Sequence, residues 1–201
     1  MGCLHVEPLQ GAPALLRALV VALLLAGCAA SPPSLDPALP CGGQSERRGP
    51  GLVPDLESLL PATLEGAPPV SRESGSYCST AALGAPLVKA GVAELAFAGA
   101  RWDRPRGAIS LVAYRALGLT ANVMADTFAT GADAARRISG VQAREVELAG
   151  RRGIRIDAQS RDGPLSVVLW PARADDTILA VLADSRDVAG LDAAIAALGE
   201  R

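Results

Sequence analysis

The chain has 201 residues with 19 basic and 21 acidic side chains, so its net charge is −2 and its length fits one domain with a short accompanying segment. This near-neutral balance provides no field that would recruit nucleic acid, and we expect no nucleic-acid partner. Aromatic residues make up only 3% of the chain, so its core must be built from Ala, Val, Leu and Ile.

Near the start of the chain, Arg17 precedes the apolar run Ala18 to Ala26. Such a run has the length of an export signal and falls well short of the roughly 20 residues that span a bilayer as a helix. It ends in Leu25-Ala26-Gly27-Cys28, an apolar residue, a small residue, Gly and Cys. This motif resembles the lipobox of bacterial lipoproteins.

The resemblance implies that residues 1–27 form a lipoprotein signal peptide and that Cys28 is the lipidation site, carrying diacylglycerol on its sulfur and an acyl group on its amine. Two or more acyl chains anchor a protein stably, because each buried methylene contributes about 0.8 kcal/mol. The expected location is the cell envelope, on a bacterial membrane and facing the periplasm or the exterior. The alternative is an ordinary secretory signal that is cut after Ala30.

A proline-rich segment follows the signal, since nine of the fifteen prolines lie between residues 29 and 69. This composition predicts an extended tether over residues 28–70, with a short helical turn at 55–60. Residues 71–201 are expected to form a single α+β domain.

Two cysteines, Cys41 and Cys78, remain once Cys3 and Cys28 are assigned to the leader and the anchor. In an exported protein such a pair predicts a disulfide, which contributes about 3 to 4 kcal/mol in the chain-entropy model. A metal site would need more ligands than two thiolates, so we predict none.

The elements expected in the domain alternate between helices and strands. They are a helix at 80–90, strands at 92–98 and 108–117, a helix capped by Thr120 and running to about 137, four further strands of which the last covers 177–183, and a helix at 188–198. The resulting order is α-ββ-α-ββββ-α. It favours an antiparallel sheet of about six strands with helices packed on one face.

Apolar matching sets the expected register of the later strands. Val146 is placed opposite Ile156, across an odd loop at 150–152. The next turn is expected as a four-residue loop at 161–164, because the proline at its end cannot donate a ladder hydrogen bond, and this pairs Ile156 with Leu169.

Few reactive groups remain in the expected mature chain. The only histidine, His5, lies in the predicted signal peptide, which excludes Ser-His-Asp, Cys-His and most zinc hydrolase sites. No phosphate-binding loop or dinucleotide motif is present, and we expect no cofactor. Carboxylate pairs remain the one route to catalysis, although solvated turn residues are the favoured explanation of these acids.

Tryptophan and arginine cluster in one polar turn, at Arg101, Trp102, Arg104 and Arg106. These residue types anchor interfaces and bind carboxylates, so they form a possible partner-binding surface. The alternative is a hairpin in which Trp102 folds over the sheet and the arginines are solvated.

The expected function is therefore that of a lipid-anchored envelope protein acting as a non-enzymatic binding or structural module, whose partner is an envelope protein or a small ligand. One alternative is a carboxylate-dependent hydrolase acting on an envelope polymer. Another is a carrier with an apolar cavity between sheet and helices, which the many small alanine side chains suggest.

Overall fold

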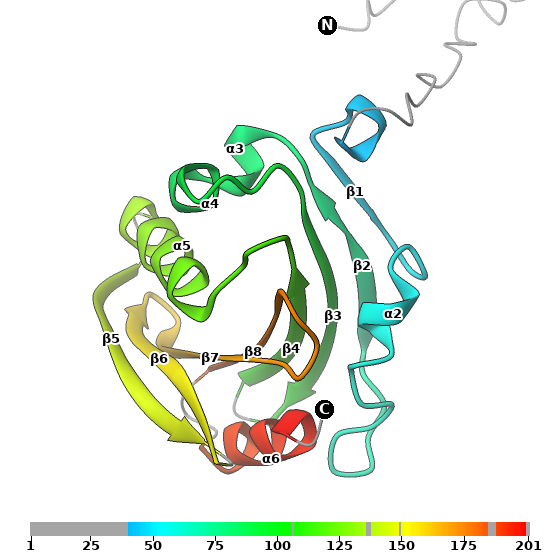
Figure 1. Cartoon of the computed structure of the whole chain (residues 1–201). Helices are drawn as coiled ribbons and strands as arrows, with labels where there is room; N and C mark the ends of the chain where they lie inside the picture. Colours follow the sequence, from blue (N-terminus) through cyan, green and yellow to red (C-terminus); the bar gives the residue numbers. More distant parts are fainter. Residues whose placement is uncertain (1–39, 106, 136–137, 149, 185–187, 200–201) are drawn as a thin grey trace, which may run out of the picture. The chain divides into compact units, whose positions relative to one another are not determined.

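The computed structural model describes residues 40–201 apart from 106, 136–137, 149, 185–187 and 200–201. It contains one eight-stranded antiparallel sheet in the order β1-β2-β3-β4-β8-β7-β6-β5 (Figure 1). The strands are β1 (Glu46–Gly49), β2 (Ser71–Tyr77), β3 (Leu95–Arg104), β4 (Gly107–Arg115), β5 (Ile138–Leu148), β6 (Arg151–Ser160), β7 (Gly163–Pro171) and β8 (Thr177–Asp184). The predicted α+β class is confirmed.

Short helices connect and cover these strands. They are the 3-10 helix η1 (Pro40–Gly43) and the α-helices α2 (Pro54–Glu57), α3 (Thr80–Leu83), α4 (Ala85–Lys89), α5 (Ala121–Ala134) and α6 (Val188–Gly199). The helix predicted at 80–90 is divided at Gly84, whose φ is 79°. No helix in the described part of the chain is both long and apolar enough to cross a bilayer.

The sheet has two more strands than the six expected, because β1 and β2 lack an apolar alternation. The buried face of β2 carries Ser74, which is fully buried. Its hydroxyl accepts a hydrogen bond from the Val53 amide at 3.0 Å and donates one to the Glu57 carboxylate. A polar side chain with such partners can lie in a core, so β2 gives no hydrophobic signal.

Helices pack on both faces of the sheet, which corrects the expected arrangement on one face. Alternate residues of a strand point to opposite faces. In β8, Leu179 and Val181 lie in a core with α2 and α6, whereas Ile178 and Ala180 lie in a core with α3, α4 and α5. Because this central strand is apolar on both sides, each side requires a cover.

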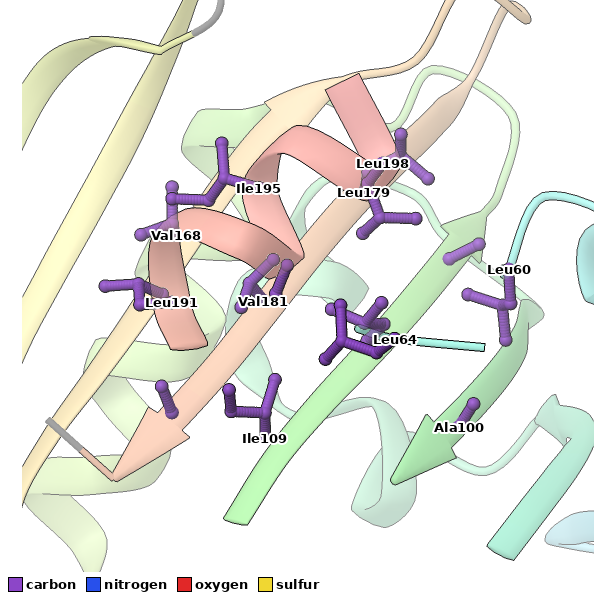
Figure 2. Close-up of a cluster of buried hydrophobic side chains, with 14 of the residues drawn as sticks. Leu60, Leu64, Ala100, Ile109, Val168, Leu179, Val181, Leu191, Ile195 and Leu198 are labelled. Atoms are coloured by element: carbon purple, nitrogen blue, oxygen red, sulfur yellow. The ribbon is translucent and has the colours of Figure 1, made fainter. Parts of the chain in front are cut away.

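The core under α6 closes one face of the sheet. Figure 2 shows Leu191, Ile195 and Leu198 of α6 above Val168, Leu179 and Val181 of β7 and β8. Leu60 and Leu64, from the segment that follows α2, join the same cluster.

Residues 40–70 were expected to be part of the tether, but they pack as part of the domain. The expected domain boundary at residue 71 is therefore corrected. This segment supplies β1 to the sheet and buries Leu56, Leu60 and Leu64, each no more than 4% exposed. The prolines separate short elements without preventing the leucines between them from packing. Residues 1–39, including Cys28, lie outside the described part of the chain.

The registers of the last hairpins also differ from expectation. Val146 pairs with Gly153, three residues away from its expected partner Ile156, because a tight turn replaces the odd loop. Gly150 supports that turn with a φ of 73°. At the next turn Ser160 pairs with Gly163, so the loop has two residues and Ile156 pairs with Val167.

Candidate ligand cavity

The predicted disulfide between Cys41 and Cys78 is present and joins η1 to the residue that follows β2, with a Cα–Cα distance of 5.9 Å. Glu94 lies close enough to both sulfurs to complete a three-ligand cluster. Because the sulfurs are bonded to each other, they are not available as thiolate ligands.

The possible partner-binding residues do not share one exposed surface. Trp102 is 1% exposed, and its Nε1 donates a hydrogen bond to the Ala67 carbonyl at 2.9 Å, as in the hairpin alternative. The exposed Arg101 points to the other face and forms an ion pair with Asp103 at 3.1 Å. Arg104 pairs with Glu65, and Arg106 lies outside the described residues.

A cavity of about 360 Å³ lies between α3, α4 and α5 and the sheet face that they cover. Figure 1 shows the sheet curving around α5 on this side. Most of the cavity wall is apolar. The lining residues are Tyr77, Ala82, Leu83, Leu87, Leu95, Tyr114, Met124, Thr127, Phe128, Gly131, Ala132, Ile138, Ile156, Ala158, Leu165 and Val167.

The inner face of α5 explains why space remains there. Thr120 begins the helix as predicted, since its hydroxyl accepts a hydrogen bond from the Val123 amide. The lining positions then recur at helical spacing, but the last turn presents only Gly131 and Ala132. A Cβ placed at Gly131 would meet no atom within 4 Å. The small side chains of the last turn therefore leave the cavity unfilled.

Three side chains of the cavity wall carry a hydroxyl, and two of them are tyrosines. Tyr77 stacks on Phe97 with ring centroids 4.9 Å apart, and Tyr114 packs edge-on against Phe128 at 6.3 Å. Burial raises the pKa of both phenols. Both hydroxyls therefore stay protonated at neutral pH and can donate hydrogen bonds. The third hydroxyl, that of Thr127, donates to the Val123 carbonyl at 2.7 Å.

Arg48 of β1 lies beside Tyr77. Its guanidinium donates a hydrogen bond to the Tyr77 hydroxyl and lies 5.2 Å from the centre of that ring. Two carboxylates, of Glu46 and Glu73, are each 3.5 Å from it. Gly75 is the residue opposite Arg48 in β2, so no side chain at that position separates Arg48 from the aromatic rings.

Comparison with known protein families, curated proteins and solved structures finds no match to this chain. Its functional interpretation therefore depends on the cavity and on the chemistry of the described side chains.

Two carboxyl groups outside the cavity, those of Asp157 and Asp55, have lowered pKa values. Burial of Asp157 tends to raise its pKa, but hydrogen bonds from Ser166 and Arg155 and the charges of Arg155 and Arg144 lower the pKa below its ordinary value. Hydrogen bonding to Arg115 lowers the pKa of Asp55. Both groups are therefore stable anions rather than proton donors at neutral pH.

No sequence motif singles out Tyr77 or Tyr114 as site residues. The available signal was the stripe along α5, where large apolar residues give way to Gly131 and Ala132 in the last turn. That change indicates that the side chains on one face of the helix leave space unfilled at its last turn. It does not identify the strands that face the space.

Proposed function

We propose that this protein is a lipid-anchored component of the bacterial cell envelope that binds a small apolar ligand in the cavity between α3, α4, α5 and the sheet. The observation that carries the proposal is the apolar cavity itself, whose size is within the range of 300–1,000 Å³ that is typical of small-molecule sites. The lipobox at Cys28 supports the anchor, and the Cys41–Cys78 disulfide is consistent with export.

An apolar occupant suits this cavity better than water does. A buried water needs two to four polar partners, and the wall offers few polar atoms. Each methylene transferred from water into such a site contributes roughly 0.8 kcal/mol. An alkyl chain of moderate length would therefore bind without a charged partner.

The hydrolase alternative gains no support from Asp55 and Asp157, the two carboxyl groups whose pKa values are shifted. A hydrolase that uses only acids needs one carboxyl whose pKa is raised, so that it can protonate the leaving group. The pKa values of Asp55 and Asp157 are both lowered. These two residues are suited to ion pairs and do not supply that acid.

Photoaffinity labelling of the full-length protein in lipid nanodiscs tests the proposal. The probe is decanol carrying a diazirine, and the labelled peptides are identified by mass spectrometry. We expect labels on the peptides that contain α5 and β6, which line the cavity. Mapping the label separates cavity binding from partition of the probe into lipid.

Two alanines of α5 provide a matched pair of variants. Ala132 lines the cavity and Ala134 is exposed outside it. Ala132→Phe should reduce cavity labelling about tenfold or more, since loss of roughly 1.4 kcal/mol of contacts has that effect. Ala134→Phe should label like the wild type, and thermal unfolding checks that both variants fold. Absence of cavity labelling in the wild type, or equal labelling of the two variants, would refute the proposed function.

A further inference from the structure

Tyr114 lines the cavity, and its hydroxyl has no hydrogen-bond acceptor among the described residues. Tyr114 lies on β4, opposite Phe97 on one side and Ile178 on the other, so apolar side chains flank it within the sheet. Tyr114 is partly buried, and a donor withdrawn from water without an acceptor is costly. An occupant that brings an acceptor atom would remove that cost.

Tyr77 presents a second donor on the same wall. Its oxygen already accepts a hydrogen bond from Arg48, and its own proton has no acceptor among the described residues. Both tyrosines therefore offer a proton and require an oxygen lone pair in return. The polar part of the ligand should be a hydroxyl, carbonyl or ester oxygen.

The charges beside Tyr77 indicate that this oxygen is uncharged. Arg48 contributes one positive charge, but Glu46 and Glu73 each lie 3.5 Å from its guanidinium. The three groups together carry a charge of −1, which repels an anionic head group. Arg48 is thus already neutralised and is not available to pair with a carboxylate or phosphate ligand.

We propose that the cavity takes an uncharged, single-chain amphiphile whose oxygen accepts a hydrogen bond from the Tyr114 hydroxyl. A single chain fits because about 360 Å³ is near the lower end of the range for small-molecule sites. This inference rests on the proposed function and adds the chemical class of the ligand. It assigns Tyr114 as a binding residue that selects the ligand by its oxygen.

Competition against the diazirine-bearing decanol tests this assignment on the full-length protein. The competitors are decanol, decane and decyl sulfate, which share a chain and differ in having a neutral oxygen, no oxygen or a permanent negative charge. We expect decanol to compete about fivefold better than decane, as one neutral hydrogen bond predicts. Decyl sulfate should compete less well than decanol.

Variants identify the residue responsible. Tyr114→Phe should abolish the fivefold advantage of decanol over decane and leave competition by decane unchanged. Thr127→Val is the matched control, because the Thr127 hydroxyl also lies in the wall but is already bonded to the Val123 carbonyl. This variant should keep the advantage of decanol.

The outcomes separate the two proposals. If cavity peptides are labelled but Tyr114→Phe keeps the preference for decanol, the assignment of Tyr114 is wrong. If decyl sulfate competes best, the ligand class is wrong. In both cases the cavity remains a binding site. If cavity peptides are not labelled at all, the proposed function itself is refuted.

Discussion

The pairing of β1 with β2 depends on the absence of a side chain at Gly75. A Cβ at this position would lie 1.8 Å from the Arg47 carbonyl oxygen and 2.8 Å from its carbon. Both atoms belong to the backbone, so no side-chain rotation relieves the contact. Gly75→Ala should therefore force β1 away from β2.

The magnitude follows from the contacts that β1 makes. Moving the strand until the new contact is acceptable requires a shift of more than about 1 Å, which breaks hydrogen bonds of normal length. Four residue pairs join β1 to β2, and each broken hydrogen bond costs roughly 0.5–1.5 kcal/mol. The Arg48 contact with the aromatic rings adds about 0.5–1 kcal/mol. If two of these hydrogen bonds break together with the Arg48 contact, Gly75→Ala lowers the free energy of unfolding by about 1.5–4 kcal/mol.

Urea denaturation measures this loss, and hydrogen exchange locates it in β1 and β2. Gly99→Ala in β3 is the matched control, because a Cβ there would meet Val112 Cγ2 at 3.8 Å, an ordinary contact. This control should be neutral or stabilise by up to about 0.5 kcal/mol. Equal unfolding free energies for the two variants would show that the pairing of β1 with β2 does not require glycine at position 75.

Two further substitutions test the hydrogen bonds of Asp157 and the packing of Trp102. Asp157→Asn should cost about 1 kcal/mol at neutral pH, because Asp157 is hydrogen-bonded to Arg155 and Ser166. Since folding lowers the pKa of Asp157, the difference from wild type should begin to shrink as pH falls below the ordinary value of 3.8 and should vanish once pH has fallen through the lower pKa of the folded state; an acid titration of stability showing an unchanged difference throughout would contradict this reasoning. Trp102→Phe should cost about 2 kcal/mol in thermal or urea unfolding, from a smaller ring and the lost bond to Ala67. Its cavity labelling should equal that of the wild type, because Trp102 lies on the opposite face; reduced labelling of a stably folded variant would argue against this placement.

The sequence predicted best those helices and strands whose position depends on residues close together in the chain. The helix that begins after Thr120 and the strand Thr177–Asp184 occur where expected. A capping hydroxyl acts on an amide three residues away, and a strand that is apolar throughout must be buried. Both signals need only neighbouring residues.

Register was predicted less well, because more than one pairing satisfies the apolar pattern. The pairings of Val146 with Ile156 and with Gly153 both produce a hairpin, and the choice depends on the turn. Gly150 with its positive φ permits the shorter turn. At the following turn, the Ser160 hydroxyl accepts a hydrogen bond from the Asp162 amide and donates one to the Gly163 carbonyl, which favours two residues over four.

By itself, the sequence determined the α+β class, several helix and strand positions and the cysteine pair, because each follows from spacing, capping or the number of available thiols. The lipid anchor remains a prediction from the lipobox. Only the tertiary structure decided that helices cover both faces, that the polar strand β2 enters the sheet and that Tyr77 and Tyr114 line one cavity. Those features depend on which surfaces meet after folding, and the cavity exists because the small residues ending α5 face a sheet that does not fill the space.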